Sequence, residues 1–290
     1  MNFSFQYVRP ARLDEALALL EEHGADAHLL AGGTDLLVRL RHGRALPRIV
    51  IDLKRVTELN GGIVETGSGL RIGALAVMTD IIADEHVRRR FPALVEAARV
   101  VGSVQIRNRA TLAGNICNAS PAADSAPALL VYGAAVNLAG RAGARSVPLA
   151  GFFTGPGRTV LKRGEIVASI DLPFPPVPSG AAFGRLTRRR GVDLATVNLA
   201  CLVTARGETR FAFGAVGPRP FLVTDDTGVL ARPNGDPRAK DEALQRLIAH
   251  AAPISDLRGS REYRRAMLSV ISRRALSAAI ERMRHDGAEA

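Results

Sequence analysis

Two glycine-centred segments constrain the fold of this chain more than any other feature. Residues 29–37 read LLAGGTDLL, and residues 106–117 read IRNRATLAGNIC. In each segment an apolar run leads into glycine, which lets the backbone turn sharply and leaves N–H groups uncovered by side chains. Taken singly, the first is explained as well by a tight strand-to-helix turn and the second by a polar loop. Together, two such loops can hold a diphosphate from both sides.

The first segment predicts a strand over residues 28–31, a glycine turn, and a helix through Leu40 that Thr34 or Asp35 would cap. A helix start offers unpaired N–H groups to an anion, and the Thr34 hydroxyl adds a donor. A carboxylate repels phosphate, so we expect Asp35 to cap the helix or to bond sugar hydroxyls. In the second segment, hydroxyl, amide and backbone donors follow one another, which suits phosphate and sugar oxygens.

The proline-rich run at residues 173–180 (PFPPVPSG) is the predicted linker, since clustered prolines stop helix and sheet alike. A length of 290 residues allows two domains. Before the run we expect helices mixed with strands, and a hairpin over residues 63–74. The expected helices are 14–22, 79–84, 92–101 and one that starts over 120–124. Thr79 would cap the second of these, and Asp124 would lie in the first turn of the last. After it, strand-like runs at 182–186, 196–205 and 210–216 precede helices at 239–251 and 260–284. This order predicts an antiparallel sheet with helices on one face.

Composition excludes several classes of protein. No apolar run reaches the length of a membrane span, and the N-terminus carries neither a basic nor an apolar signal segment, so we expect a cytoplasmic protein. Two distant cysteines, Cys117 and Cys201, are expected to be buried thiols. With six unclustered histidines, they argue against a zinc or iron–sulfur site in this chain, and we expect no metal.

The net charge of +11 raises the question of whether this chain binds nucleic acid. Its arginine clusters lack the interleaved aromatic residues of a stacking platform, so solvated faces or acidic protein partners explain the charge better, and we expect no nucleic-acid partner. No nucleophile–base pair stands out, so no side chain is assigned a catalytic role. Loops shaped for a cofactor without such machinery indicate that the cofactor carries the reaction.

Residues 31–36 (AGGTDL) followed by 111–115 (TLAGN) resemble the FAD-binding medium subunit of molybdenum hydroxylases, the family of xanthine dehydrogenase, carbon monoxide dehydrogenase and 4-hydroxybenzoyl-CoA reductase. The segments at 120–124, 164–167, 188–193 and 259–265 resemble it as well. The resemblance implies an α+β fold: a two-subdomain FAD-binding domain of the vanillyl-alcohol-oxidase (PCMH) type over residues 1–175 (subdomains about 1–55 and 56–175), then a carbon monoxide dehydrogenase flavoprotein C-terminal domain over 181–285.

The same resemblance implies an electron-transfer role. A molybdopterin-binding large partner would pass electrons to iron–sulfur clusters on a small [2Fe-2S] partner, and FAD would take them from these clusters. FAD would then pass them to NAD, a quinone, a cytochrome or oxygen. The assembly would be a dimer of heterotrimers. The alternative is a self-sufficient FAD oxidoreductase with its own substrate site. The cofactor-binding residues implied by the loops and the resemblance are Leu30, Ala31, Gly32, Gly33, Thr34, Asp35, Leu36, Val101, Thr111, Ala113, Gly114, Asn115, Asp124, Val167 and Arg185.

Overall fold

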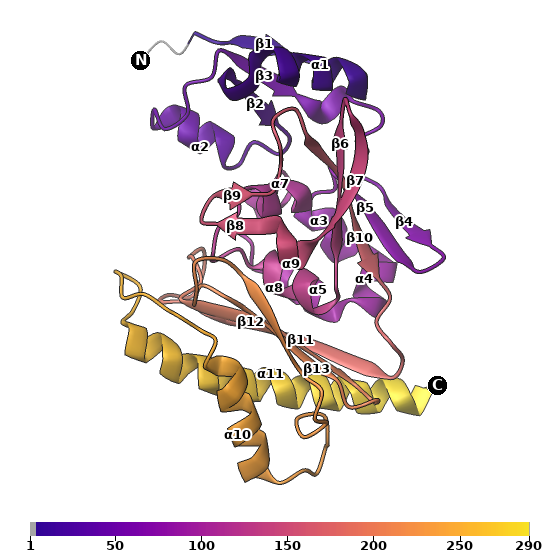
Figure 1. Ribbon diagram of the computed structural model, residues 1–290, viewed down its shortest axis with the longest axis vertical. Helices are drawn as coiled ribbons and strands as arrows, with labels where there is room; N and C mark the ends of the chain where they lie inside the picture. The colour runs from indigo at the N-terminus through magenta and orange to yellow at the C-terminus, as the bar shows by residue number, and fades with distance from the viewer. Residues whose placement is uncertain (1–3, 290) are drawn as a thin grey trace.

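The computed structural model describes residues 4–289 and stacks three units along its long axis (Figure 1). The first unit is a parallel sheet in the order β1-β3-β2. Its elements are β1 (Gln6–Val8), α1 (Leu13–His23), η1 (Gly24–Asp26), β2 (Ala27–Leu30), α2 (Leu36–Arg41), β3 (Ile49–Asp52) and η2 (Leu53–Arg55). Helix α1 ends at His23, and the residue that follows it, Gly24, has a φ of +52°, which residues other than glycine rarely adopt.

The second unit is an antiparallel sheet in the order β4-β5-β10-β6-β7, with short helices beside it. The sheet strands are β4 (Ile63–Thr66), β5 (Gly69–Gly73), β6 (Ala135–Gly140), β7 (Gly143–Pro148) and β10 (Ile166–Pro173), and β8 (Phe153–Gly155) and β9 (Arg158–Thr159) form a separate ribbon. The helices are α3 (Met78–Ala83), α4 (Glu85–Arg90), α5 (Pro92–Arg99), α6 (Val104–Arg107), α7 (Leu112–Cys117), α8 (Ser125–Val131) and α9 (Leu149–Phe152).

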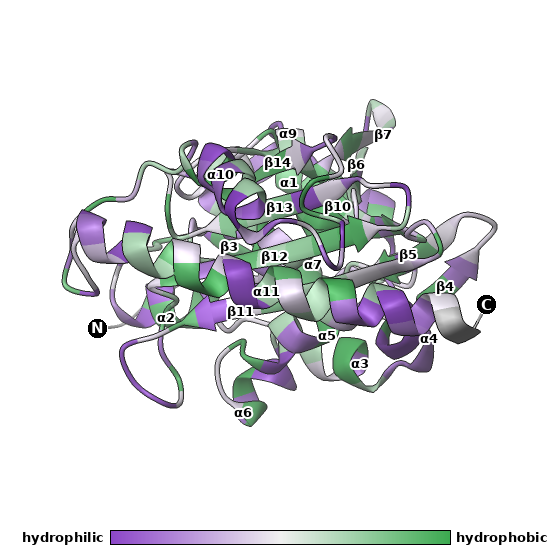
Figure 2. Cartoon of the chain, turned by 90° about the horizontal axis from the view of Figure 1, so that it is seen from below, coloured by the Kyte–Doolittle hydropathy of each residue, from purple (hydrophilic) through white to green (hydrophobic). Residues whose placement is uncertain are grey.

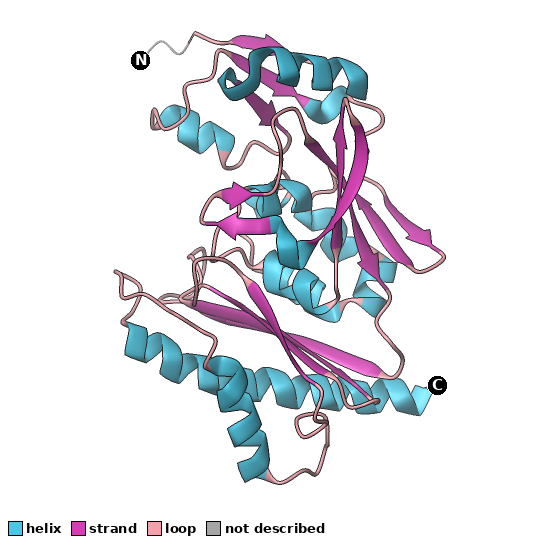
Figure 3. Ribbon diagram, in the orientation of Figure 1, coloured by secondary structure: helices cyan, strands magenta, loops and turns pink. Residues whose placement is uncertain are grey.

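The third unit is an antiparallel sheet whose two faces are both covered (Figure 3). It contains β11 (Ser179–Leu186), β12 (Val197–Thr204), β13 (Thr209–Gly214), β14 (Phe221–Asp225), α10 (Pro237–Ile248) and α11 (Arg261–Glu289). Helices α10 and α11 cover one face, and α5 and α8 of the second unit cover the other. Green and purple residues are mixed along α11 (Figure 2), as expected of a helix that packs one face on a sheet and exposes the other.

Small side chains allow this sheet to approach the second unit closely. Ala181, Ala200 and Ala212 belong to the same buried cluster as helices α5 and α8, whereas Leu199 and Phe213 pack with α10 and α11. Neighbouring residues of one strand thus enter different cores, since side chains alternate between the two faces of a sheet. The second and third units are therefore joined by a continuous apolar core.

Several predictions from the sequence are confirmed. Strands β4 and β5 form the expected hairpin, and the C-terminal sheet is antiparallel with its own helices on one face. The chain also crosses between sheets at the proline-rich run, with Phe174 to Pro178 lying between β10 and β11. Within residues 4–289, none of the helices combines the length and apolar content that a membrane-spanning segment needs.

Three expectations about helix starts are wrong. Helix α3 begins at Met78, after Val77, and Thr79 lies inside it and caps nothing. Residues 120–124 are a loop, and α8 begins only at Ser125; Asp124 therefore precedes the first turn, and its carboxylate accepts a hydrogen bond from Asn198 and does not cap the helix. At α2, Asp35 holds the N-cap position but makes no capping hydrogen bond.

Candidate functional site

A cavity of about 700 Å³ opens where the three units meet, within the size range of ligand pockets in proteins. Both glycine segments line it. Further parts of the wall come from η2, from the residues that follow β5 and α5, from β10, from the loop before α8, and from the loop that joins β11 to β12. Apolar residues of three different segments, Val101, Ile106 and Leu194, share this lining with the polar loops.

The two glycine segments lie directly against each other. A Cβ atom on Gly32 would sit 2.0 Å from the backbone oxygen of Arg109, so no side chain fits between the loops at this point. Gly33 has a φ of +77°, a conformation that favours glycine. The first loop therefore requires glycine at two successive positions for two different reasons, contact at one and backbone conformation at the other.

The first loop presents a row of free donors. Among the described residues, no acceptor is found for the backbone N–H groups of residues 32–36, although these residues line the cavity. The first bond of the following helix is made by the N–H of Leu37, which donates to the carbonyl of Gly33 at 2.9 Å. Consecutive uncovered N–H groups at a strand-to-helix turn are suited to bind a phosphate group.

The second loop satisfies most of its own donors. Thr111 caps α7, because its hydroxyl accepts a hydrogen bond from the N–H of Gly114 at 3.0 Å. The N–H of Asn115 donates to the carbonyl of Thr111 at 3.0 Å, and the amide oxygen of Asn115 accepts from Ser125 at 2.6 Å. This leaves the N–H groups of Thr111 and Ala113 without described acceptors, so the second loop supplies a firm wall with few donors.

The side chain of Asp35 does not cap helix α2, so the first of the two expectations for this residue is wrong. Its side chain accepts a hydrogen bond of 3.3 Å from the amide of Asn118, which also lines the cavity. Partial desolvation raises the pKa of Asp35, while nearby Arg39 opposes the rise. The other expectation, a bond to sugar hydroxyls, stays a prediction.

Asp124 is the most perturbed carboxyl in the cavity wall. Burial raises its pKa from 3.8 to about 6, while Arg185 and a hydrogen bond from Asn198 act in the opposite direction. The Nε atom of Arg185 lies 3.2 Å from its Oδ1 atom, and the Nδ2 atom of Asn198 donates to the same oxygen at 2.8 Å. Asp124 thus belongs to a buried polar cluster shared by the second and third units.

The structure gathers thirteen of the fifteen residues selected from the sequence around this one cavity. The two that do not line it are Leu30 and Arg185. Leu30 lies in β2 with its Cδ1 atom beside Gly33, and Arg185 reaches the site through its contacts with Asp124 and Asp193, which both line the cavity. The cavity-lining members are Ala31, Gly32, Gly33, Thr34, Asp35, Leu36, Val101, Thr111, Ala113, Gly114, Asn115, Asp124 and Val167.

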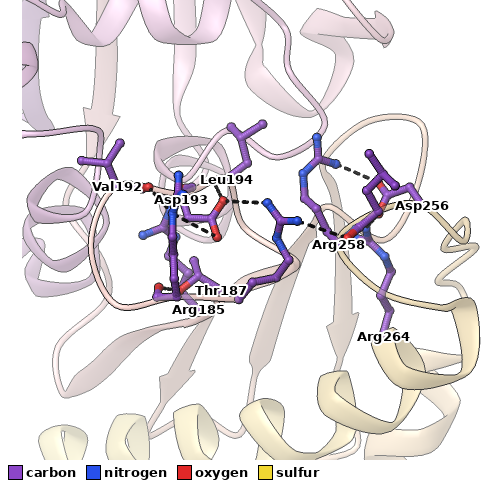
Figure 4. A network of polar contacts seen from close by, with 11 residues as sticks. Arg185, Thr187, Val192, Asp193, Leu194, Asp256, Arg258 and Arg264 are labelled. Atoms are coloured by element: carbon purple, nitrogen blue, oxygen red, sulfur yellow. Dashed lines mark hydrogen bonds and ion pairs between the residues drawn. The ribbon is translucent and has the colours of Figure 1, made fainter.

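Sequence reasoning missed the loop over residues 187–195. Arg189, Val192 and Leu194 line the cavity, and the guanidinium of Arg185 donates to the backbone oxygen of Asp193 (Figure 4). Asp193 is nearly buried and also pairs with Arg188 at 3.6 Å. The run at 188–193 had been noted only for its resemblance to the family, and a loop that approaches from another domain leaves no local signal.

The expectation of two buried cysteines is half wrong. Cys201 is buried in the C-terminal sheet, whereas Cys117 is only partly buried and lines the cavity. The apolar surroundings of Cys117 raise the pKa of its thiol to about 12. At neutral pH the thiol is therefore protonated, and it contributes to the wall as a small apolar group.

The donor set of the cavity fits FAD. Uncovered N–H groups match a diphosphate, Asp124 and Asn115 can bond hydroxyls, and apolar side chains at the other lining positions can cover a flat ring system. Glycine at positions 32 and 33 lets the first loop lie against Arg109 and adopt a positive φ, which keeps this row of N–H groups in the cavity wall. The residues present therefore accommodate the cofactor that the sequence implied.

Comparison with known proteins identifies the family. The FAD binding domain in molybdopterin dehydrogenase matches residues 3–175, and the CO dehydrogenase flavoprotein C-terminal domain matches residues 182–279. The carbon monoxide dehydrogenase medium chain of Hydrogenophaga pseudoflava is 36% identical over 279 residues, covering 95% of this chain and 96% of that one. The xanthine dehydrogenase FAD-binding subunit of Escherichia coli O157:H7 is 33% identical over 283 residues, covering 94% and 95%.

A solved structure agrees with this assignment. A chain of the reconstituted CO dehydrogenase from Oligotropha carboxidovorans superposes with a TM-score of 0.90 at 32% identity, covering 97% of this chain and 99% of that one. The α+β fold and the FAD cofactor expected from the sequence are thereby confirmed. This chain belongs to the family of FAD-binding subunits of molybdenum hydroxylases and is an oxidoreductase subunit.

Proposed function

We propose that this chain carries electrons within a heteromeric molybdenum hydroxylase, from iron–sulfur clusters of a partner through FAD to an external acceptor. The observation that carries the proposal is the row of N–H groups without described acceptors at residues 32–36, which line a cavity of about 700 Å³. Relatives named as medium chains of carbon monoxide dehydrogenase match this chain over almost its full length, which supports a role as one subunit among several.

The residues have separate tasks in this proposal. The N–H groups of the first loop hold the diphosphate, the capped second loop forms the opposite wall, and Asp124 accepts a hydrogen bond from a hydroxyl of the cofactor. FAD, when bound, accepts electrons one at a time and releases them as a pair. The fifteen residues named from the sequence are proposed as the binding set, with Arg185 acting through Asp124.

We extend the proposal to the assembly and the domain limits. The partners would be a molybdopterin-binding large subunit and a [2Fe-2S] small subunit, in a dimer of heterotrimers, with NAD, a quinone, a cytochrome or oxygen as acceptor. The FAD domain would span 1–175, of which residues 1–3 lie outside the described part, with subdomains about 1–55 and 56–175. The C-terminal domain would span 181–285.

Purification of the chain from its own cells tests the proposal. We expect yellow protein that releases FAD on denaturation and that carries two further subunits with molybdenum and iron in fixed ratio. A colourless chain would contradict the cofactor site. A yellow chain that purifies alone and oxidises an organic substrate by itself would favour the self-sufficient oxidoreductase.

A further inference from the structure

The C-terminal sheet turns one buried amide toward the FAD domain. Along β12, Leu199 and Cys201 pack with α10 and α11, whereas Ala200 and Leu202 join the core of the FAD domain. Asn198 shares the face of Ala200 and Leu202, since residues two apart on a strand point to the same side. Its exposed fraction is 0%, and a buried amide is unfavourable unless it finds hydrogen-bond partners.

Asn198 directs its donors at the loop before α8. Its Nδ2 atom lies 2.8 Å from Oδ1 of Asp124, 3.4 Å from the carbonyl oxygen of Ala123 and 3.5 Å from that of Ala122. Three acceptors on one side fix which end of the amide carries the nitrogen. The Oδ1 atom of Asn198 is buried and finds no partner in the described part of the chain, so the amide is satisfied at one end only.

The neighbouring strand is adapted to this arrangement. Gly214 is paired with Asn198 in the sheet, and a Cβ atom on Gly214 would lie 2.1 Å from the amide oxygen of Asn198. The next residue, Ala215, has a φ of +60°, which is uncommon for alanine, and its N–H donates to the carbonyl of Pro121 at 2.7 Å. Strand β12 and the end of the adjacent strand β13 therefore both form hydrogen bonds with the cavity-lining loop before α8.

We propose that Asn198 is a positioning residue for FAD, which holds the carboxylate of Asp124 from the C-terminal sheet. Asn198 and Arg185 occupy the Oδ1 atom of Asp124, and no partner is found for Oδ2 among the described residues. Because Asp124 lines the cavity, Oδ2 remains available to accept a hydrogen bond from the cofactor. The inference rests on the proposed FAD site and gives the C-terminal domain a part in cofactor binding through a residue that does not line the cavity.

A double-mutant cycle on the full-length chain tests this role, with the dissociation constant of FAD measured by titration of the apoprotein. We expect Asn198→Leu to weaken binding about tenfold or more, as loss of a hydrogen bond to a charged group does. Asn198→Ala, which removes the amide without adding bulk, should do the same. Either change combined with Asp124→Ala, which removes the acceptor of the Asn198 hydrogen bond, should bind FAD no more weakly than Asp124→Ala alone. Thr209→Val on β13, which removes a buried hydroxyl that does not line the cavity, should leave the affinity unchanged.

The pH profile separates positioning from general damage to the fold. Arg185 is the charged group that faces Asp124, and it is retained in every variant at position 198. Without the Asn198 donor, the carboxylate of Asp124 is less favoured, so the acid loss of FAD affinity should move to higher pH in Asn198→Ala. Equal weakening at all pH values, strictly additive losses, or wild-type affinity in Asn198→Ala would overturn the inference. A wild-type chain that binds no FAD would overturn the proposed function along with it.

Discussion

The two glycine loops look alike in sequence but differ in what their backbones are free to do. The first loop leaves the N–H groups of residues 32–36 without described acceptors, whereas the second uses the Thr111 hydroxyl and carbonyl to satisfy Gly114 and Asn115. They touch where Gly32 meets Arg109. One loop is thus built to donate to a ligand and the other to stay rigid beside it, and similar glycine motifs do not imply similar roles.

The largest effect should come from placing a methyl group between the loops. Gly32→Ala would set a Cβ atom 2.0 Å from a backbone oxygen that cannot move alone, so we expect a loss of stability of about 3 kcal/mol or more and no bound FAD. Chemical denaturation and flavin absorbance measure the two effects.

Gly114→Ala is the matched change in the other loop. Its Cβ atom would lie 2.7 Å from the hydroxyl oxygen of Thr111, which can rotate away, so the loss should stay within about 1 kcal/mol, the value of the helix cap. Equal effects of the two alanines would show that the loops are equivalent after all.

Next in size is Gly33→Val, whose Cβ atom would lie 2.8 Å from the Cδ1 atom of Leu30 and would displace the first loop from the conformation in which it should bind the diphosphate. Two charge-assisted hydrogen bonds are at risk, so FAD affinity should fall by about 100-fold or more. Gly43→Val is the control, since Gly43 also has a positive φ, +65°, but none of the described residues lies within 4 Å of its Cβ position. Both variants should lose about 1–3 kcal/mol from backbone strain, and only the first should be colourless. Full FAD occupancy in Gly33→Val would place the diphosphate elsewhere.

The pKa of Asp124 predicts a pH effect on the apoprotein. Because the folded pKa of about 6 exceeds the ordinary 3.8, the folded chain holds a proton that the unfolded chain has released. Asp124 therefore lowers stability as pH rises from about 4 to about 6, by up to about 3 kcal/mol at 1.36 kcal/mol per pKa unit. Urea unfolding of wild type and Asp124→Asn across this range should show the extra slope only in wild type. Parallel curves would mean that Asp124 is already ionised at pH 4.

The smallest effect concerns the cap of the second loop. Thr111→Ala removes the hydroxyl that binds the N–H of Gly114, and we expect a loss of about 1 kcal/mol from the thermal or chemical unfolding free energy. FAD affinity should change by less than tenfold, because this loop supplies few donors. Ser103→Ala, which removes the cap of α6, is the comparison. A loss of FAD in Thr111→Ala as large as that in Gly33→Val would reverse the roles assigned to the loops.

Local patterns were enough to predict much of this fold. The hairpin of β4 and β5 follows from a turn between two short apolar runs, and the antiparallel C-terminal sheet from alternating strands followed by two helices. The sequence did not predict strands β14 and β1. Strand β14 forms by pairing with β13, and strand β1 forms by pairing with β3. Short segments of this kind have weak preferences of their own and are stabilised by a neighbouring strand.

The candidate site shows the same division. Gly32, Gly33 and Gly114 were found because glycine marks close approach and unusual backbone angles. Asn198 and Leu194 could not be found in this way, because each reaches the cavity wall from the other domain, and the sequence gives no distance between a β12 amide and the loop before α8.

The sequence by itself determined the two glycine loops, the domain order and the family, because each of these depends on residues that are neighbours along the chain. Only the tertiary structure decided that the turns touch, that one has free donors while the other is capped, and that the C-terminal sheet holds Asp124. Those features depend on contacts between residues tens of positions apart, and such contacts form only once the separate cores have packed together.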